Sequence, residues 1–155
     1  MKAYFAHPYE LWKTKKEEQI LNIIEQRGWE PFNPFDKEDH LLQKHEVTCY
    51  YDDPNRELAN EIVRIDLKNL SECEVLVAYF PRRFRGVGTI MEIMYAWLKG
   101  KYIVIIVEGK SGVRNLHAWL VSAADEYYSS LEDFVNKRNN LCWKIPIEWR
   151  IPHGL

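Results

Sequence analysis

Residues 74–107 read EVLVAYFPRRFRGVGTIMEIMYAWLKGKYIVIIV, and this stretch decides the fold. Two continuous apolar runs, at 74–80 and 102–107, are typical of strands that are buried on both faces of a parallel sheet. Between them, residues 89–99 have the composition of a helix, and the glycine at position 100 ends it. A strand, a helix and a second strand in this order form a parallel βαβ unit, so the stretch predicts an α/β protein.

The remainder of the sequence continues this alternation of strands and helices. We expect strands at 3–6 and 29–32, a short edge strand at 126–128, and helices at 11–27, 56–71, 115–123 and 131–139. Five strands joined by helices favour a flavodoxin-like three-layer sandwich with a five-stranded parallel sheet in the order 2-1-3-4-5. Ligands bind such sheets at the carboxyl ends of the strands, near the switch in strand order. A site is therefore expected in the loops after residues 6, 32, 80 and 107.

Length and composition indicate one domain that spans residues 1–155, with an extended C-terminal arm from about 141 to 155. The polar connection at 33–55 is long for a compact domain, which is typical of a functional or mobile segment such as a lid. The net charge of −2 gives no support for binding to a nucleic acid polymer or an anionic membrane.

Three widely spaced cysteines, an odd number, do not indicate a disulfide framework. The N-terminus lacks the apolar core of a signal peptide, and the apolar runs are too short to span a bilayer. We therefore expect a cytoplasmic protein without a membrane partner.

Glu92 is the one carboxylate in an otherwise apolar helix. An acid in the first turns of a helix is favoured by the helix dipole, and a surface position would also explain it. However, residues 93–98 leave little polar face for Glu92 to join. A buried carboxylate is costly without a partner, so a functional role is the sharper hypothesis.

Asp66 raises the same question on the helix at 56–71. It interrupts an apolar row with a spacing of four, formed by Leu58, Ile62 and Leu70. Asp66 is either a solvated acid at the edge of the row, a cap for a neighbouring loop, or an acid that projects toward the ligand edge.

The loop before the Glu92 helix contains Gly86, Gly88 and several arginines, including Arg83 and Arg85. Glycines allow close approach of the backbone, and free N–H groups at a helix start attract anions. A solvated loop and a phosphate- or carboxylate-binding loop are both consistent with this pattern. The sequence has no complete nucleotide-binding glycine motif or nucleophile elbow, and its histidines and cysteines match no usual zinc spacing.

Four stretches, taken in order, resemble the nucleoside 2-deoxyribosyltransferase family. They are YFAHPY at 4–9, RIDLKNLSECEVLVAYF at 64–80, GVGTIMEIMYAWLKGKYIVII at 86–106 and RNLHAWLVS at 114–122. Relatives in this family include hydrolases that cleave the N-glycosidic bond of nucleoside 5′-monophosphates. The resemblance implies that Glu92 is the nucleophile, that Asp66 contacts the sugar and supports the nucleophile, and that Tyr4 holds it in place. It also implies that Asn115 helps to shape the site, in some members from a neighbouring subunit.

Two positions depart from the family pattern. Gly86 stands where deoxyribosyltransferases usually have an aspartate that handles the nucleobase, and His7 stands where small residues are common. The proton donor to the leaving base is therefore unassigned, with His7 as a candidate. The nucleotide hydrolases also lack that aspartate and bind phosphate partly through this loop, a role that Arg83 and Arg85 could fill.

The resemblance implies cleavage and transfer of the N-glycosidic bond of 2′-deoxynucleosides through a glutamyl-glycosyl intermediate. The alternatives are a 2′-deoxynucleoside 5′-monophosphate N-glycosidase and a nucleotide-binding module without turnover. The chemistry needs no metal and no organic cofactor. A homo-oligomer is expected, because related sites are completed across subunits and Trp97, Trp119 and the tail offer apolar contact surface.

Overall fold

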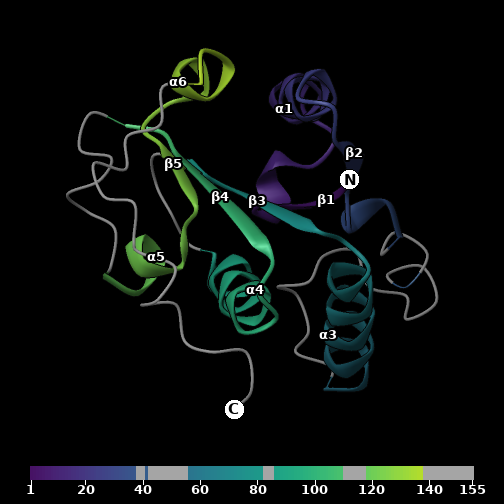
Figure 1. Cartoon of the computed structure of the whole chain (residues 1–155). Helices are drawn as coiled ribbons and strands as arrows, with labels where there is room; N and C mark the ends of the chain where they lie inside the picture. Colours follow the sequence, from purple (N-terminus) through teal and green to yellow (C-terminus); the bar gives the residue numbers. More distant parts are fainter. Residues whose placement is uncertain (38–40, 42–55, 82–85, 110–117, 138–155) are drawn as a thin grey trace.

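Five parallel strands form the central sheet of the computed structural model, which describes residues 1–37, 41, 56–81, 86–109 and 118–137 (Figure 1). The strands are β1 (Lys2–Ala6), β2 (Glu30–Phe32), β3 (Val75–Phe80), β4 (Tyr102–Val107) and β5 (Glu126–Tyr128). Their order is β2-β1-β3-β4-β5, and every neighbouring pair is parallel. The predicted fold class and strand order are confirmed.

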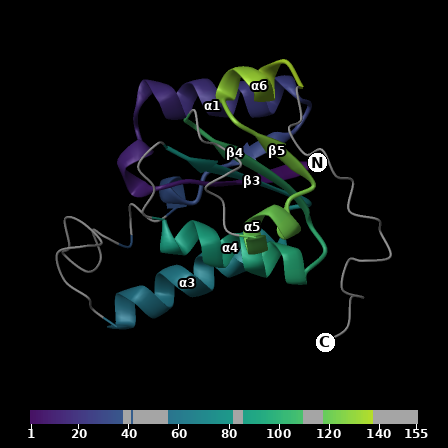
Figure 2. The same cartoon turned by 90° about the vertical axis from the view of Figure 1, so that its left-hand side faces the viewer.

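Helices cover both faces of this sheet. The helices α1 (Lys15–Gln26) and α6 (Leu131–Val135) lie on one face, and α3 (Arg56–Ser71), α4 (Val87–Leu98) and α5 (Ala118–Ala123) lie on the other (Figures 1 and 2). Successive side chains of a strand point to opposite faces. Tyr4 therefore packs in the core beneath α3, α4 and α5, whereas Phe5 packs in the core beneath α1.

The two central strands are buried as their apolar runs predicted. Every residue of β3 is buried, and β4 is buried at its four middle positions. The paired positions Val77 and Val104 lie at the centre of the register. This arrangement aligns the carboxyl ends of β1, β3 and β4 at one edge of the sheet.

The helix α1 begins four residues later than the sequence predicted. Residues Tyr9–Leu11 form a separate 3-10 turn, and Lys13 has a left-handed φ of 59°. The Thr14 side chain then accepts the backbone N–H of Glu17 at 3.2 Å, which caps the start of α1 at Lys15.

Other helix ends also differ from the prediction. The helix α4 begins at Val87, two residues early, and α6 ends at Val135, four residues early, shortly before Lys137 with a left-handed φ of 53°. The described part of α5 begins at Ala118. The expected arm at 141–155 and most of the connection at 33–55 lie outside the described residues, although residues 35–37 are helical.

The glycine–lysine pair after α4 has a structural role. Gly100 has a positive φ of 66°, which a glycine adopts at no steric cost. The Lys101 Nζ donates to the backbone oxygens of Ser71 at 2.8 Å and Cys73 at 2.5 Å, so it satisfies carbonyls at the end of α3. Burial raises the pKa of the Cys73 thiol to about 11, which is typical of a structural cysteine.

None of the helices in the described part of the chain is long and apolar enough to cross a membrane.

Candidate active site

Tyr4 of β1 reaches across to Glu92 of α4. The Tyr4 ring is fully buried, and its hydroxyl donates a hydrogen bond of 2.7 Å to Glu92 Oε1. The ring also stacks on Phe32, the last residue of β2, with 5.9 Å between the ring centroids. The contact joins residues 88 positions apart in the sequence and lies on the face of the sheet that α3, α4 and α5 cover.

Three effects set the pKa of Glu92, and together they raise it to about 8. Burial of the carboxyl group is the largest cause, and repulsion by the Asp66 carboxylate acts in the same direction. The Tyr4 hydrogen bond opposes both, because it stabilises the ionised form. Burial and the neighbouring acid therefore favour the protonated form of Glu92 at neutral pH.

Asp66 lies on α3, the helix beside α4 (Figures 1 and 2). It is half-buried, and in its row Leu58 and Leu70 are buried. The Asp66 carboxylate is near enough to raise the pKa of Glu92. The structure thus brings Tyr4 and Asp66 close to Glu92, three residues that the family resemblance connects.

The start of α4 carries two glycines with different surroundings. Gly86 is half-buried and its carbonyl accepts the N–H of Ile90 at 3.2 Å. Gly88 is exposed, and a Cβ added there would meet nothing within 4 Å. Packing against the described residues therefore does not require a glycine at position 88. Thr89, which follows, is buried.

His7 lies on the opposite side of the sheet from Tyr4. Its ring packs on Phe5, with 4.3 Å between centroids, and its Nε2 lies 3.2 Å from Glu17 Oε1 and 3.3 Å from Asn33 Oδ1. The His7 side chain is fully buried by these contacts. The structure therefore does not bring His7 together with Glu92.

Glu17 and Asn33 contact His7 and were not predicted from the sequence. Both are buried, and the Asn33 Nδ2 donates to Glu17 Oε1 at 2.7 Å. Burial acts to raise the pKa of Glu17, but hydrogen bonds from His7, Asn33 and the Lys13 backbone outweigh it and lower that pKa. The spacing Thr14-x-x-Glu17 is a capping-box signature, which could have indicated that Glu17 is held in place.

Three predicted site residues, Arg83, Arg85 and Asn115, lie outside the described residues. The two histidines and the cysteine that were considered as zinc ligands, His40, His45 and Cys49, lie outside them as well. Within the described ranges, no group of three or more His, Cys, Asp or Glu side chains could hold a metal ion.

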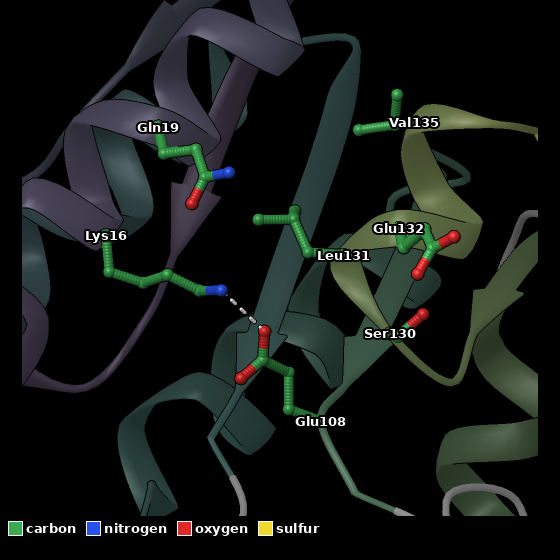
Figure 3. Close-up of a pocket in the computed structure, with 7 residues that line it drawn as sticks. All are labelled: Lys16, Gln19, Glu108, Ser130, Leu131, Glu132 and Val135. Atoms are coloured by element: carbon green, nitrogen blue, oxygen red, sulfur yellow. Dashed lines mark ion pairs between the residues drawn. The ribbon is translucent and has the colours of Figure 1, made fainter.

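A hollow of about 450 Å³ opens between α1 and α6 on the other face of the sheet (Figure 3). The Lys16 ammonium points across it to Glu108, at a distance of 2.7 Å. The remaining lining residues are Gln19, Ser130, Leu131, Glu132 and Val135. None of Tyr4, Asp66 and Glu92 lines it. Because its walls carry a partly solvated ion pair, we place the candidate chemistry at Glu92 instead.

The chain is a parallel α/β protein in which the Glu92 carboxyl group accepts a hydrogen bond from Tyr4 and lies near a second acid, Asp66. A family model for nucleoside 2-deoxyribosyltransferase matches residues 3–139. The chain therefore belongs to the nucleoside 2-deoxyribosyltransferase family, as its sequence motifs predicted. A comparison with curated proteins finds no significant match.

Solved structures share the fold at low sequence identity. A 2-deoxyribosyltransferase from Bacillus psychrosaccharolyticus is 14% identical with a TM-score of 0.64, and the match covers 88% of this chain and 91% of that one. A CMP N-glycosidase from Clostridium botulinum is 18% identical with a TM-score of 0.55, over 89% of this chain and 97% of that one. A conserved protein from Enterococcus faecalis is 19% identical with a TM-score of 0.53, over 88% and 95% of the two chains.

Proposed function

We propose that the protein cleaves the N-glycosidic bond of 2′-deoxynucleosides and transfers the sugar to a second nucleobase. The arrangement of Tyr4, Asp66 and Glu92 is the observation that carries this proposal. A half-buried carboxylate, oriented by a hydroxyl and close to a second acid, suits attack on an anomeric carbon. Membership of a family that acts on this bond supports the same chemistry.

The reaction proceeds in two displacements at C1′. The Glu92 carboxylate attacks C1′ as the C1′–N bond breaks, and the electron pair of that bond leaves with the nucleobase, which takes up a proton. The product is a glycosyl ester of Glu92. A second base then attacks C1′ through its own nitrogen, loses a proton, and releases Glu92 as a carboxylate. Asp66 binds a sugar hydroxyl, and Tyr4 keeps Glu92 oriented.

Glu92 must lose its proton before it attacks, since its pKa in the free protein is about 8. The Tyr4 hydrogen bond favours the ionised form of Glu92. A sugar hydroxyl that donates to Asp66 would reduce the repulsion between the two acids, so substrate binding itself helps Glu92 to ionise.

A hydrolase is the second candidate, and Gly86 is the feature that favours it. Deoxyribosyltransferases usually have an aspartate at this place that handles the nucleobase, and the nucleotide hydrolases resembled by this chain lack it. Water would then attack the glycosyl ester in place of a second base, and a nucleoside 5′-monophosphate would be the substrate. The arginines at positions 83 and 85 would bind its phosphate.

One incubation separates these functions. The protein is mixed with a deoxynucleoside, or with its 5′-monophosphate, together with a free second base, and the products are resolved by chromatography. The transferase yields the new nucleoside, whereas the hydrolase yields free base with sugar or sugar phosphate. Binding measured by thermal stabilisation, without product at long times and unchanged in Glu92→Ala, would instead support a module without turnover.

We also propose that the protein acts as a homo-oligomer. Large apolar side chains are exposed on the helices next to the site: Val87, Met91 and Leu98 on α4, and Trp119 on α5. Exposed apolar side chains on neighbouring helices are typical of a contact surface. Light scattering at micromolar concentration should give a mass above that of one chain, and a monomer would contradict the proposal.

A further inference from the structure

A buried polar cluster joins three segments of the chain beneath the carboxyl edge of the sheet. His7 follows β1, Glu17 lies in the first turn of α1, and Asn33 follows β2. These three residues are exposed by only 4%, 6% and 7%. Burying polar groups costs free energy unless they are hydrogen-bonded to one another. The contacts within this cluster therefore indicate the protonation state of its groups.

We propose that Glu17 and Asn33 are positioning residues that hold the His7 ring protonated on both nitrogens, and that this cluster fixes the end of β1 so that Tyr4 orients Glu92. The link from Tyr4 to Glu92 rests on the proposed function. The protonation of the ring does not depend on it.

Among the residues that the structure describes, every contact of the two ring nitrogens is with an oxygen that accepts. Nδ1 lies 3.0 Å from the carbonyl oxygen of Pro8. Nε2 lies 3.2 Å from Glu17 Oε1 and 3.3 Å from Asn33 Oδ1. A neutral ring has one N–H and one lone pair, and the lone pair would then face an oxygen. Only the ring with both protons satisfies both sides.

The orientation of the Asn33 amide is fixed by its own partners. Its Oδ1 accepts the backbone N–H of Phe35 at 3.2 Å, and its Nδ2 donates to Glu17 Oε1 at 2.7 Å. A flipped amide would place a donor against the N–H of Phe35 and an oxygen against the carboxylate. The oxygen that faces His7 is therefore an acceptor.

Glu17 supplies the negative charge that a protonated ring needs. Its Oε1 faces His7 and Asn33, and its Oε2 accepts the Lys13 backbone N–H at 2.6 Å. These donors hold the pKa of Glu17 below its ordinary value in spite of burial, so Glu17 is ionised at neutral pH. The rings of Phe5 and Phe35 also contact His7 and carry no charge, which leaves Glu17 as its counter-ion among the described residues.

The cluster acts on the candidate site through β1 and β2. Tyr4 lies three residues before His7, and it pairs in register with Phe32, which directly precedes Asn33. The Tyr4 ring also stacks on Phe32. Loosening the cluster would therefore let the ends of both strands shift, and with them the hydroxyl that lies 2.7 Å from Glu92.

This assignment has a chemical consequence for His7. Both of its protons are directed to oxygens of the protein, and its ring packs on the α1 side of the sheet. His7 is therefore a positioning residue, and the proton that the leaving base takes up comes from another group.

The protonation of His7 is tested by ¹⁵N NMR of the full chain with labelled histidine, at pH 7. The signals that disappear in His7→Asn belong to His7, or, if that variant does not fold, contacts of the ring protons with Phe5 identify them. Both ring nitrogens should give protonated signals in the wild type, and Glu17→Gln should convert one of them to an unprotonated signal. An unprotonated nitrogen in the wild type, or an unchanged spectrum in Glu17→Gln, would overturn the assignment.

The positioning role is tested by kinetics on the same variant. We expect Glu17→Gln to lower kcat by about 10- to 100-fold with little change in KM, because the reacting groups are misplaced and substrate binding is not. A displaced Tyr4 hydroxyl would also raise the pKa of Glu92, so the pH–rate profile of Glu17→Gln should shift to higher pH. Simple loss of folded protein would not cause this shift. Glu18→Gln, at the exposed neighbouring acid, is the matched control and should keep the wild-type profile.

A wild-type kcat and pH profile in Glu17→Gln would overturn the positioning role. If the wild type shows no glycosidic activity, the proposed function fails, while the NMR result still decides the state of His7. The two proposals can therefore fail separately.

Discussion

Two glutamates lie on opposite faces of the same sheet, and each contacts the first strand or the residue after it. Within the described part of the chain, Glu92 accepts one hydrogen bond, from Tyr4, and faces the like charge of Asp66. Glu17 accepts hydrogen bonds from His7, Asn33 and the Lys13 backbone. Burial acts to raise the pKa of both, yet the pKa of Glu92 is raised to about 8 and that of Glu17 is lowered.

The difference shows that partners, and not burial alone, decide what a buried carboxylate does. With enough donors, Glu17 stays ionised and holds segments of the chain together. Glu92 has one donor and a neighbouring acid, so its ionised form is poorly stabilised. A carboxyl group with a pKa raised in this way is typical of a functional site. The following substitutions test this contrast, from the largest expected effect to the smallest.

Glu92→Gln should abolish most of the turnover. We expect kcat to fall by about 10³-fold or more, as it does when a nucleophile is removed from other enzymes. Folding should be near normal, because the amide keeps the shape of the side chain and removes the repulsion from Asp66. Circular dichroism and the base-exchange assay measure the two effects, and a variant with wild-type rates would remove the catalytic assignment.

The same substitution at Glu17 should lower stability instead. Glu17→Gln weakens hydrogen bonds to a charged, buried group, so we expect the free energy of unfolding to drop by about 1–3 kcal/mol. Glu92→Gln should lower it by less, or raise it, at pH 7–8. Urea unfolding of both variants, beside Glu18→Gln, provides the measurement. Equal losses for Glu17→Gln and Glu92→Gln would break the comparison between the two acids.

The two acids should also shape the pH dependence of stability in opposite ways. The folded-state pKa of Glu92 is raised from 4.5 to about 8. The contribution of Glu92 to the free energy of unfolding is therefore complete below pH 4.5 and is lost as the pH rises through 8. Because the pKa of Glu17 is lowered, its contribution is present above pH 4.5 and is lost as the pH falls below that value.

Thermal unfolding across pH 3–9 would reveal both slopes. Glu92→Gln should reduce the loss of stability that occurs as the pH rises from 4.5 to 8. Glu17→Gln should reduce the loss of stability that occurs as the pH falls below 4.5. A slope that stays unchanged in the matching variant would show that another group causes it.

Tyr4→Phe should have a smaller and more specific effect. The ring and its packing remain, so the loss of stability should be about 1 kcal/mol or less. The hydrogen bond lowers the pKa of Glu92, and its removal should raise that pKa further. The pH at which kcat reaches half of its maximum should therefore move upward. A profile identical to that of the wild type would separate Tyr4 from the ionisation of Glu92.

Gly88→Ala should produce the smallest change. A Cβ at this position meets nothing within 4 Å, and alanine favours a helix over glycine by about 0.5–1 kcal/mol. We expect higher stability in urea unfolding together with a raised KM if Gly88 is kept for close approach of the substrate. Gly28→Ala is the contrasting control, because its φ of 81° makes alanine strained there.

The sequence predicted the sheet because its strongest signals are local. The apolar runs that became β3 and β4 are typical of strands that are covered on both faces, so they predicted the centre of the sheet. The alternation of strands with helices then favoured the parallel order that the structure has. The predicted ends of the helices were less accurate. The start of α1 depended on the left-handed Lys13 and on the Thr14 cap, and apolar spacing from Leu11 onward does not reveal either.

The candidate site was predicted in part. Glu92 was conspicuous because it was the one acid in an apolar helix, and its connection to Tyr4 and Asp66 came from the family resemblance. Glu17 and Asn33 were missed, since an acid in a charged helix and an asparagine before a proline look solvated in the sequence. Only the fold shows that both face His7, because the contact spans three separate segments.

The most direct test of the central claim is the detection of a sugar bonded to Glu92. The protein is mixed with a deoxynucleoside in excess, quenched in acid, digested and analysed by mass spectrometry. We predict that the peptide with Glu92 gains the mass of one deoxyribosyl group, and that Glu92→Gln shows no such adduct. Release of free base with the adduct on another residue would contradict the assignment of Glu92 as the nucleophile.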